Sequence, residues 1–159
     1  MKTIPEYFRN ANYEMVKYDG SPVSWRISIY GFVVENNSVL VVKHKDEKFW
    51  DIPGGGVEMG EELAETLSRE GKEEAGWELT LIQPVSTHID WFYHAGEEKF
   101  YRAIQFFWTA KGRKVGEPTE GKIEEVKFVP FDELEHLLNA NGYEAFQKAV
   151  ALKIIPSSK

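Results

Sequence analysis

Three glutamates, Glu70, Glu73 and Glu74, carry the clearest chemical pattern in this sequence. On a helix with 3.6 residues per turn, Glu73 and Glu74 fall within about a quarter-turn on either side of Glu70. Like charges on one helical edge repel each other, so this spacing predicts a cation among the three carboxylates. Hard divalent cations take oxygen ligands, and magnesium binds through a few carboxylates together with phosphates. For the three glutamates alone, a solvated acidic helix face is the alternative interpretation.

The helix that carries these glutamates follows a glycine-rich turn at residues 53–56. Apolar or small residues recur every four positions along it and predict a buried stripe: Leu63, Leu67, Gly71 and Ala75. Glu65 and Lys72 point away from both the stripe and the acidic edge. The helix is therefore expected to have a core side, a solvent side and an acidic edge between them.

Residues 55–77 resemble the Nudix box, the signature of the Nudix hydrolase family, G-x5-E-x7-R-E-U-x-E-E-x-G-U, where U is a bulky aliphatic residue. Every fixed position is filled at the right spacing, by Gly55, Glu61, Arg69, Glu70, Glu73, Glu74 and Gly76. Two positions depart from the pattern, because Gly71 and Trp77 stand where the family has aliphatic residues. Glycine inside a helix costs about 1 kcal/mol relative to alanine. Both positions should face the core, and Trp77 is a candidate to fill the space beside Gly71.

The resemblance implies a role for each box residue. The expected ligands of a divalent cation, magnesium with manganese as a substitute, are Glu70 and Glu74, then Glu73, with the backbone carbonyl of Gly55. These glutamates are also expected to help activate water, and which of them acts as the base is left open. Arg69 should orient a glutamate through a salt bridge, and Glu61 should support the junction between loop and helix.

Composition narrows the class of protein. The chain has 159 residues, 42% of them hydrophobic, which predicts one domain spanning residues 1–159. Cysteine is absent, which excludes disulfides, thiolate zinc sites and a cysteine nucleophile. The sequence lacks an apolar run of the ~20 residues that a membrane span needs, and its first ten residues lack the core of a signal peptide, so a cytoplasmic protein without a membrane partner is expected. A net charge of -7 argues against a nucleic-acid polymer as partner but allows a small phosphorylated substrate delivered with magnesium.

Candidate substrate-binding residues lie outside the box. Lys43 and Lys45 are the best cations to meet a polyphosphate, although solvated loop charges are the alternative. His44 between them is interpreted as a surface histidine. Trp50 is expected either to pack in the core or to stack on a base. Tyr93, sixteen residues after the box, resembles a tyrosine of family members that act on dinucleoside polyphosphates.

Many family members supply one more acidic residue from the loop before the last strand. The candidates here are Glu120, Glu124 and Glu125. Glu124 and Glu125 face opposite sides of a strand, so at most one of them should reach the metal. Solvent exposure is the alternative for each.

The remaining pattern predicts the elements that position these residues. Strands are expected at residues 13–18, 25–35, 38–42, 78–89 with a break near Pro84, 100–110 and 123–130, with a turn at Asn36 and Asn37. Residues 1–10 are expected to form a short helix or an arm, and residues 111–122 a loop. A helix begins near Phe131, and a closing helix over residues 143–155 follows Asn141 and Gly142. The resemblance implies the Nudix α/β/α sandwich, with a mixed central β-sheet between helices.

The resemblance also implies a reaction, the magnesium-dependent hydrolysis of a phosphoanhydride bond in a nucleoside diphosphate linked to another group. The leading substrate is a (deoxy)nucleoside triphosphate, which would give a monophosphate and pyrophosphate. Dinucleoside polyphosphates, ADP-ribose and nucleotide sugars are the alternatives. A noncatalytic nucleotide-sensing domain is an alternative of another class, and a homodimer is compatible with the family.

Overall fold

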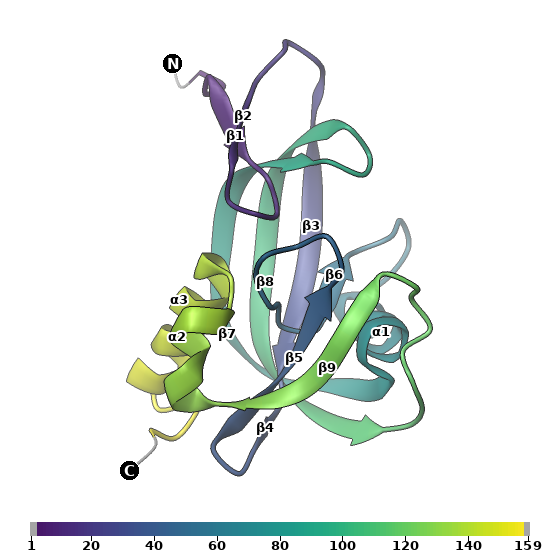
Figure 1. Cartoon of the computed structure of the whole chain (residues 1–159), viewed down its shortest axis with the longest axis vertical. Coiled ribbons are helices and arrows are strands. Elements are labelled where there is room, and N and C mark those ends of the chain that lie inside the picture. The colour runs from purple at the N-terminus through teal and green to yellow at the C-terminus, as the bar shows by residue number, and fades with distance from the viewer. Residues whose placement is uncertain (1–2, 158–159) are drawn as a thin grey trace.

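The structure is a computed structural model that describes residues 3–157. It contains two β-sheets (Figure 1). Within these residues the larger sheet has six strands in the order β2-β1-β7-β8-β3-β6, and the smaller has three in the order β4-β5-β9. The strands are β1 (Tyr7–Arg9), β2 (Met15–Lys17), β3 (Val23–Phe32), β4 (Val34–Glu35), β5 (Ser38–His44), β6 (Gly54–Gly56), β7 (Trp77–His94), β8 (Lys99–Lys114) and β9 (Ile123–Pro130). Strands β3 and β8 pair in parallel, whereas β7 and β8 are antiparallel, so the larger sheet is mixed, as predicted.

Helices cover both sides of the strands. The helical segments are α1 (Leu63–Glu70), the π-helical turn η1 (Gly71–Ala75), the 3-10 turn η2 (Phe131–Glu133), α2 (Leu134–Leu137) and α3 (Ala140–Ala151). Figure 1 shows α1 on one side of the strands and α2 with α3 on the other. This arrangement confirms the predicted α/β/α sandwich. No helix within residues 3–157 is long and apolar enough to cross a lipid bilayer.

Strand β5 shows why two helical layers are needed. Neighbouring side chains of a strand point to opposite faces. Val39 and Val41 join the hydrophobic cluster on the α3 side, whereas Leu40 and Val42 join the cluster on the α1 side. Each of these four side chains is at most 1% exposed. Because both faces are buried, the strand reads as a continuous apolar run in the sequence.

Several predicted boundaries are confirmed. Asn36 and Asn37 have φ angles of 49° and 56° and form the turn between β4 and β5. Strand β9 spans the predicted residues 123–130. Strand β7 is longer than predicted, but its register with β8 shifts next to Pro84, where a break was expected. Proline cannot donate a backbone hydrogen bond, which is the physical reason for that shift.

The N-terminal prediction of a helix or arm is wrong within the described residues. Residues 7–9 form β1, which pairs with β2 in a hairpin, and residues 1–2 lie outside the described part. Phe8 is fully buried, and its ring centroid lies 5.4 Å from that of Tyr18 and 4.9 Å from that of Phe100. Burial of this aromatic side chain stabilises the hairpin, and strands of three residues are too short for a sequence pattern to reveal.

Two other boundaries also differ from the prediction. Strand β8 continues to Lys114, into the segment expected to be a loop, because residues 111–114 pair with the start of β7. Helix α3 begins at Ala140, so Asn141 and Gly142 lie in its first turn rather than before it. Asn139 is the N-cap, and its side chain accepts a hydrogen bond of 2.8 Å from the N–H of Gly142.

Candidate functional site

The local geometry of α1 and η1 turns the acidic edge toward the glycine turn. Leu67 is fully buried and anchors the helix to the sheet. The last turn is π-helical, a widened turn that is frequent at functional sites, and it ends at Gly76 in the left-handed conformation, with φ 73°. Gly71, which begins the wide turn, is also buried. A Cβ atom there would lie 2.6 Å from Cγ of Leu79 and 2.7 Å from the carbonyl oxygen of Trp77. The side chain of Leu79 therefore occupies the space of the missing aliphatic residue, a role expected of Trp77.

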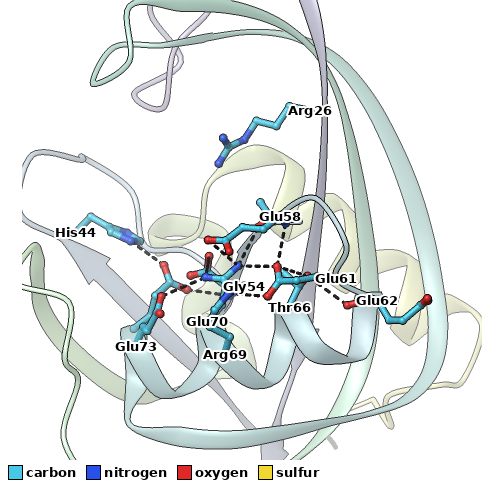
Figure 2. Close-up of polar contacts among 12 residues, drawn as sticks. Arg26, His44, Gly54, Glu58, Glu61, Glu62, Thr66, Arg69, Glu70 and Glu73 are labelled. Carbon is cyan, nitrogen blue, oxygen red and sulfur yellow. Dashed lines mark hydrogen bonds and ion pairs between the residues drawn. The ribbon is translucent and has the colours of Figure 1, made fainter.

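Arg69 joins the helix to the loop that precedes it (Figure 2). Its Nε and Nη2 atoms donate to the two carboxylate oxygens of Glu61 at 2.8 and 3.0 Å. Its Nη1 atom donates to Glu70 at 3.0 Å and to Glu73 at 3.2 Å. Hydrogen bonds from Arg69, and then from the backbone N–H of Glu58, lower the pKa of Glu61 to about 2. A bidentate guanidinium–carboxylate pair fixes geometry well, so this contact fixes the position of the loop relative to the acidic edge of the helix.

Glu70 and Glu74 approach the backbone of the glycine turn. A Cβ atom on Gly55 would lie 2.5 Å from Oε1 of Glu70, so only glycine allows this carboxylate to come so close. The N–H of Gly54 donates to Oε1 of Glu74 at 2.9 Å. Glu74 is 5% exposed, and burial raises its pKa to about 8 despite hydrogen bonds from His44 and Gly54. Burial also raises the pKa of Glu70, against the opposing effect of Arg69. A cation among these carboxylates would favour their ionised forms.

His44 is not the surface histidine that the sequence suggested. Its side chain is 16% exposed, and its Nε2 atom lies 2.9 Å from Oε2 of Glu74. Its Nδ1 atom is buried without a hydrogen-bond partner among the described residues, and a carboxylate oxygen of Glu47 lies 3.6 Å away. Burial alone would lower the pKa of His44. The hydrogen bond and charge of Glu74, with Glu47, outweigh burial and raise the pKa to about 9.

The donor set fits a hard divalent cation. Ligand atoms of His44, Glu74 and Glu120 lie within 4.8 Å of one another. Glu70 and Gly55 line the same cleft, which adds a carboxylate and a backbone carbonyl to the set. Carboxylate and backbone carbonyl oxygens gathered at one end of a cleft are the donors that magnesium or manganese prefers.

The cleft in front of these carboxylates has a volume of about 590 Å³. Its lining includes residues of β3 and β8 and of the N-terminal hairpin. Side chains that line the end near the hairpin include Arg9, Tyr13, Phe49, Asp51 and Asn139. Asn139 donates to Oδ1 of Asp51 at 2.9 Å, and Tyr13 donates to Oδ1 of Asn139 at 3.3 Å. The cleft thus joins an acidic end to an end of mixed aromatic and polar character, as binding sites for small molecules do.

The predicted site residues separate into two groups. Inside the cleft lie Glu70, Glu74, Gly55, Lys45 and Glu120. Glu73 lies outside it, with its side chain 44% exposed and its carboxylate paired with Arg69. Glu124 and Glu125 are exposed on β9. Of the three candidate acids before and within the last strand, only Glu120 therefore lines the cleft.

Three predicted substrate contacts lie elsewhere. Lys43 donates to the carbonyls of His44 and Glu47 and forms an ion pair of 3.5 Å with Glu124. Tyr93 packs against Phe100, with ring centroids 4.8 Å apart. Trp50 is 8% exposed and belongs to the core, where the ammonium group of Lys127 lies 4.5 Å from its ring centroid. Trp50 therefore packs in the core, the first of the two expected alternatives, and does not line the cleft.

Sequence reasoning missed the residues that other elements bring to the cleft. His44 comes from β5, Arg26 from β3, and Arg9 and Tyr13 from the N-terminal hairpin. The alternation of β3 groups Arg26 with Ser28 and Tyr30 on one face, which is the one signal that could have identified it. The other residues depend on pairing between distant strands.

A comparison with protein-family models matches residues 25–149 to the NUDIX domain. An ADP-ribose pyrophosphatase of Methanocaldococcus jannaschii is 38% identical over 53 residues, which cover 31% of each chain. An 8-oxo-dGTP diphosphatase of Buchnera aphidicola is 25% identical over 84 residues, 50% of this chain and 52% of the relative. The chain thus matches only about a third to a half of the length of these relatives.

Solved structures share the fold at low sequence identity. A NUDIX hydrolase from Nitrosomonas europaea superposes with a TM-score of 0.67 at 15% identity, covering 84% of this chain and 97% of that one. An ADP-ribose pyrophosphatase from Streptococcus suis gives a TM-score of 0.63 at 19% identity, covering 84% and 94%. The domain match spans most of this chain and includes the glycine turn and the acidic helix, and on that evidence the chain belongs to the NUDIX family.

Proposed function

We propose that this protein hydrolyses a phosphoanhydride bond in a nucleoside diphosphate linked to another group, with magnesium as cofactor and manganese as a substitute. The observation that carries the proposal is the approach of two buried or half-buried carboxylates, Glu70 and Glu74, to the glycine turn at one end of the cleft. Such a concentration of acidic oxygens is costly without a cation and suits one that also binds phosphate.

Each residue has a defined part in the proposed reaction. Glu70, Glu74 and Glu120, with the carbonyl of Gly55, would hold the cation. When bound, the cation supplies neutralisation of phosphate oxygens and a water of lowered pKa. Arg69 keeps Glu70 in position through its contacts with Glu61 and Gly56. His44 holds Glu74 through the bond of 2.9 Å, and Lys45 supplies a positive charge at the mouth of the cleft.

Our leading substrate is a (deoxy)nucleoside triphosphate, hydrolysed to a monophosphate and pyrophosphate. The end of the cleft near Phe49 and Tyr13 offers aromatic faces and hydrogen-bonding side chains to a nucleoside. Relatives named 8-oxo-dGTP diphosphatase and ADP-ribose pyrophosphatase support phosphoanhydride substrates as a class. Dinucleoside polyphosphates, ADP-ribose and nucleotide sugars therefore belong in the same test.

The test is a panel of these nucleotides incubated with and without magnesium, with release of a nucleoside monophosphate as readout. Glu74→Gln should reduce turnover about 100-fold or more while the protein stays folded, because it removes a charged oxygen from the cation site. Glu135→Gln, an exposed change on α2, is the matched control and should leave turnover unchanged. Nucleotide binding without metal-dependent turnover would instead identify a sensing domain.

A further inference from the structure

Arg26 brings a positive charge to the cleft from the strand opposite the acidic edge. Side chains alternate along β3, so Arg26 shares the cleft face with Ser28 and Tyr30, whereas Trp25 and Ile27 point to the other face. Strand β6 pairs with β3, with Gly56 opposite Ser28. The Arg26 side chain consequently extends over the glycine turn, as Figure 2 shows.

The guanidinium of Arg26 lies close to the backbone of Gly56 in the glycine turn. A Cβ atom on Gly56 would lie 3.2 Å from Nη2 of Arg26 and 3.3 Å from its Cζ. The next residue back, Gly55, is the one whose backbone faces the carboxylate of Glu70. The guanidinium thus lies one residue along the same turn from the proposed cation site.

The guanidinium of Arg26 is held far more loosely than the two other arginines of the site. Arg69 donates to three glutamates and a carbonyl, and Arg9 is hydrogen-bonded to Asp90 and to the carbonyl of Asn10. The ion pair of Arg26 is with Glu97 at 3.8 Å, which is longer than a hydrogen bond. The ring centroid of Tyr101 lies 5.7 Å from its Cζ. Its planar donors are therefore available to a ligand in the cleft.

We propose that Arg26 binds the non-bridging oxygens of the substrate phosphate that lies farther from the carboxylates. This inference rests on the proposed function, because a diphosphate held by the cation at one phosphate needs a second positive charge at the other. A guanidinium presents paired N–H donors that match two phosphate oxygens, and charge-assisted bonds of this kind are strong. On binding, the phosphate takes the place of Glu97 as the partner of Arg26. Arg26 is thus a residue that binds and positions substrate without contacting the cation.

The test measures the affinity of inorganic pyrophosphate in the presence of magnesium for four proteins: the wild type, Arg26→Gln, Arg26→Lys and Arg102→Gln. Arg102 is the matched control because it loses the same charge on the opposite face of the sheet, where its guanidinium lies 4.3 Å from the Trp91 ring centroid. Arg26→Gln should bind pyrophosphate about 10- to 100-fold more weakly, and Arg26→Lys should recover part of the loss. Arg102→Gln should bind like the wild type.

Two results would overturn the inference: pyrophosphate affinity of Arg26→Gln within twofold of the wild type, or an equal loss in Arg102→Gln. Thermal unfolding with magnesium alone separates binding from folding, since Arg26→Gln should keep the melting temperature and the metal-induced shift of the wild type. With the preferred nucleotide, the substitution should raise KM at least as much as it lowers kcat. If the wild type hydrolyses no nucleotide, the proposed function fails, while the pyrophosphate comparison still decides the role of Arg26.

Discussion

The Nε2 atom of His44 lies 2.9 Å from Oε2 of Glu74, and the pair joins strand β5 to the last turn of the acidic helix. Both side chains are at most 16% exposed. The other oxygen of Glu74 accepts the N–H of Gly54. In the protein without metal, His44 and the N–H of Gly54 are therefore the hydrogen-bond partners that satisfy both oxygens of this buried carboxyl group.

His44→Ala should lower the free energy of unfolding by about 1–3 kcal/mol in the presence of a chelator, because it leaves a buried carboxylate with one hydrogen bond fewer. Magnesium should raise the melting temperature of this variant more than that of the wild type, since the cation replaces the lost charge. Denaturant titrations with and without metal provide the measurement.

A double-mutant cycle isolates this contact from other effects of His44. In a Glu74→Gln background the carboxylate charge is gone, so removing His44 should cost much less. An equal cost in both backgrounds would show that His44 stabilises the protein through other contacts.

The Gly71 departure from the box leads to an unusual expectation. Gly71→Leu restores the residue type of the family pattern, yet it should destabilise this chain by about 1–3 kcal/mol, because Leu79 already fills the space. Leu79→Ala in the same chain should recover part of that loss by opening room for the new side chain. Thermal or denaturant unfolding of the two single variants and the double variant measures the coupling, and strict additivity would contradict it.

The sequence predicted the site where contacts are local in the chain. Glu61, Arg69 and Glu70 lie within ten residues on a loop and a helix of regular geometry, so spacing alone indicates which side chains can meet. The fold class followed from the same box and from strongly apolar strands such as β5. Gly71 shows the limit of this reasoning. The space that an aliphatic side chain would fill at this position is taken by Leu79, which belongs to β7.

Residues brought in by long-range pairing could not be placed in this way. His44 reaches Glu74 only because β5 packs over α1, and Arg26 reaches the glycine turn only through the pairing of β3 with β6. Trp50 illustrates a different limit, since an aromatic residue suits both a core and a base-binding surface until the face of the sheet is known. The N-terminal hairpin forms because the Phe8 side chain is buried, not because its strands have a strong local propensity.

The ion pair between Arg9 and Asp90 predicts acid sensitivity. Burial alone would raise the pKa of Asp90, but the charge and hydrogen bond of Arg9 lower it below its ordinary value of 3.8. A carboxyl group with a lower pKa in the folded state stabilises the protein above its unfolded pKa, and that stabilisation is lost as the pH falls through the folded value. Asp90→Asn should therefore be less stable than the wild type near pH 6, and the difference should shrink toward pH 3.

Denaturant unfolding at both pH values measures this difference, with Asp132→Asn, an exposed change on η2, as the control. The control should follow the wild type throughout. A gap between Asp90→Asn and the wild type that stays constant with pH would contradict the role of the ion pair.

Glu120 should be the additional acid of the cation site. The backbone N–H groups of Thr119 and Glu120 both donate to the carbonyl of Glu73 at 2.9 Å, which ties their loop to η1. The carboxylate of Glu120 is thereby held within 4.8 Å of ligand atoms of Glu74 and His44. Glu120→Gln should raise the magnesium concentration needed for half-maximal stabilisation and turnover about 10- to 100-fold.

Glu124→Gln and Glu125→Gln make the comparison specific, because they remove the same charge from the exposed strand β9 that follows. Both variants should keep the metal dependence of the wild type within about twofold, since neither carboxylate lines the cleft. Magnesium titrations of melting temperature and of turnover distinguish the three variants. A larger loss in Glu124→Gln or Glu125→Gln than in Glu120→Gln would mean that β9 moves toward the carboxylates when the cation binds.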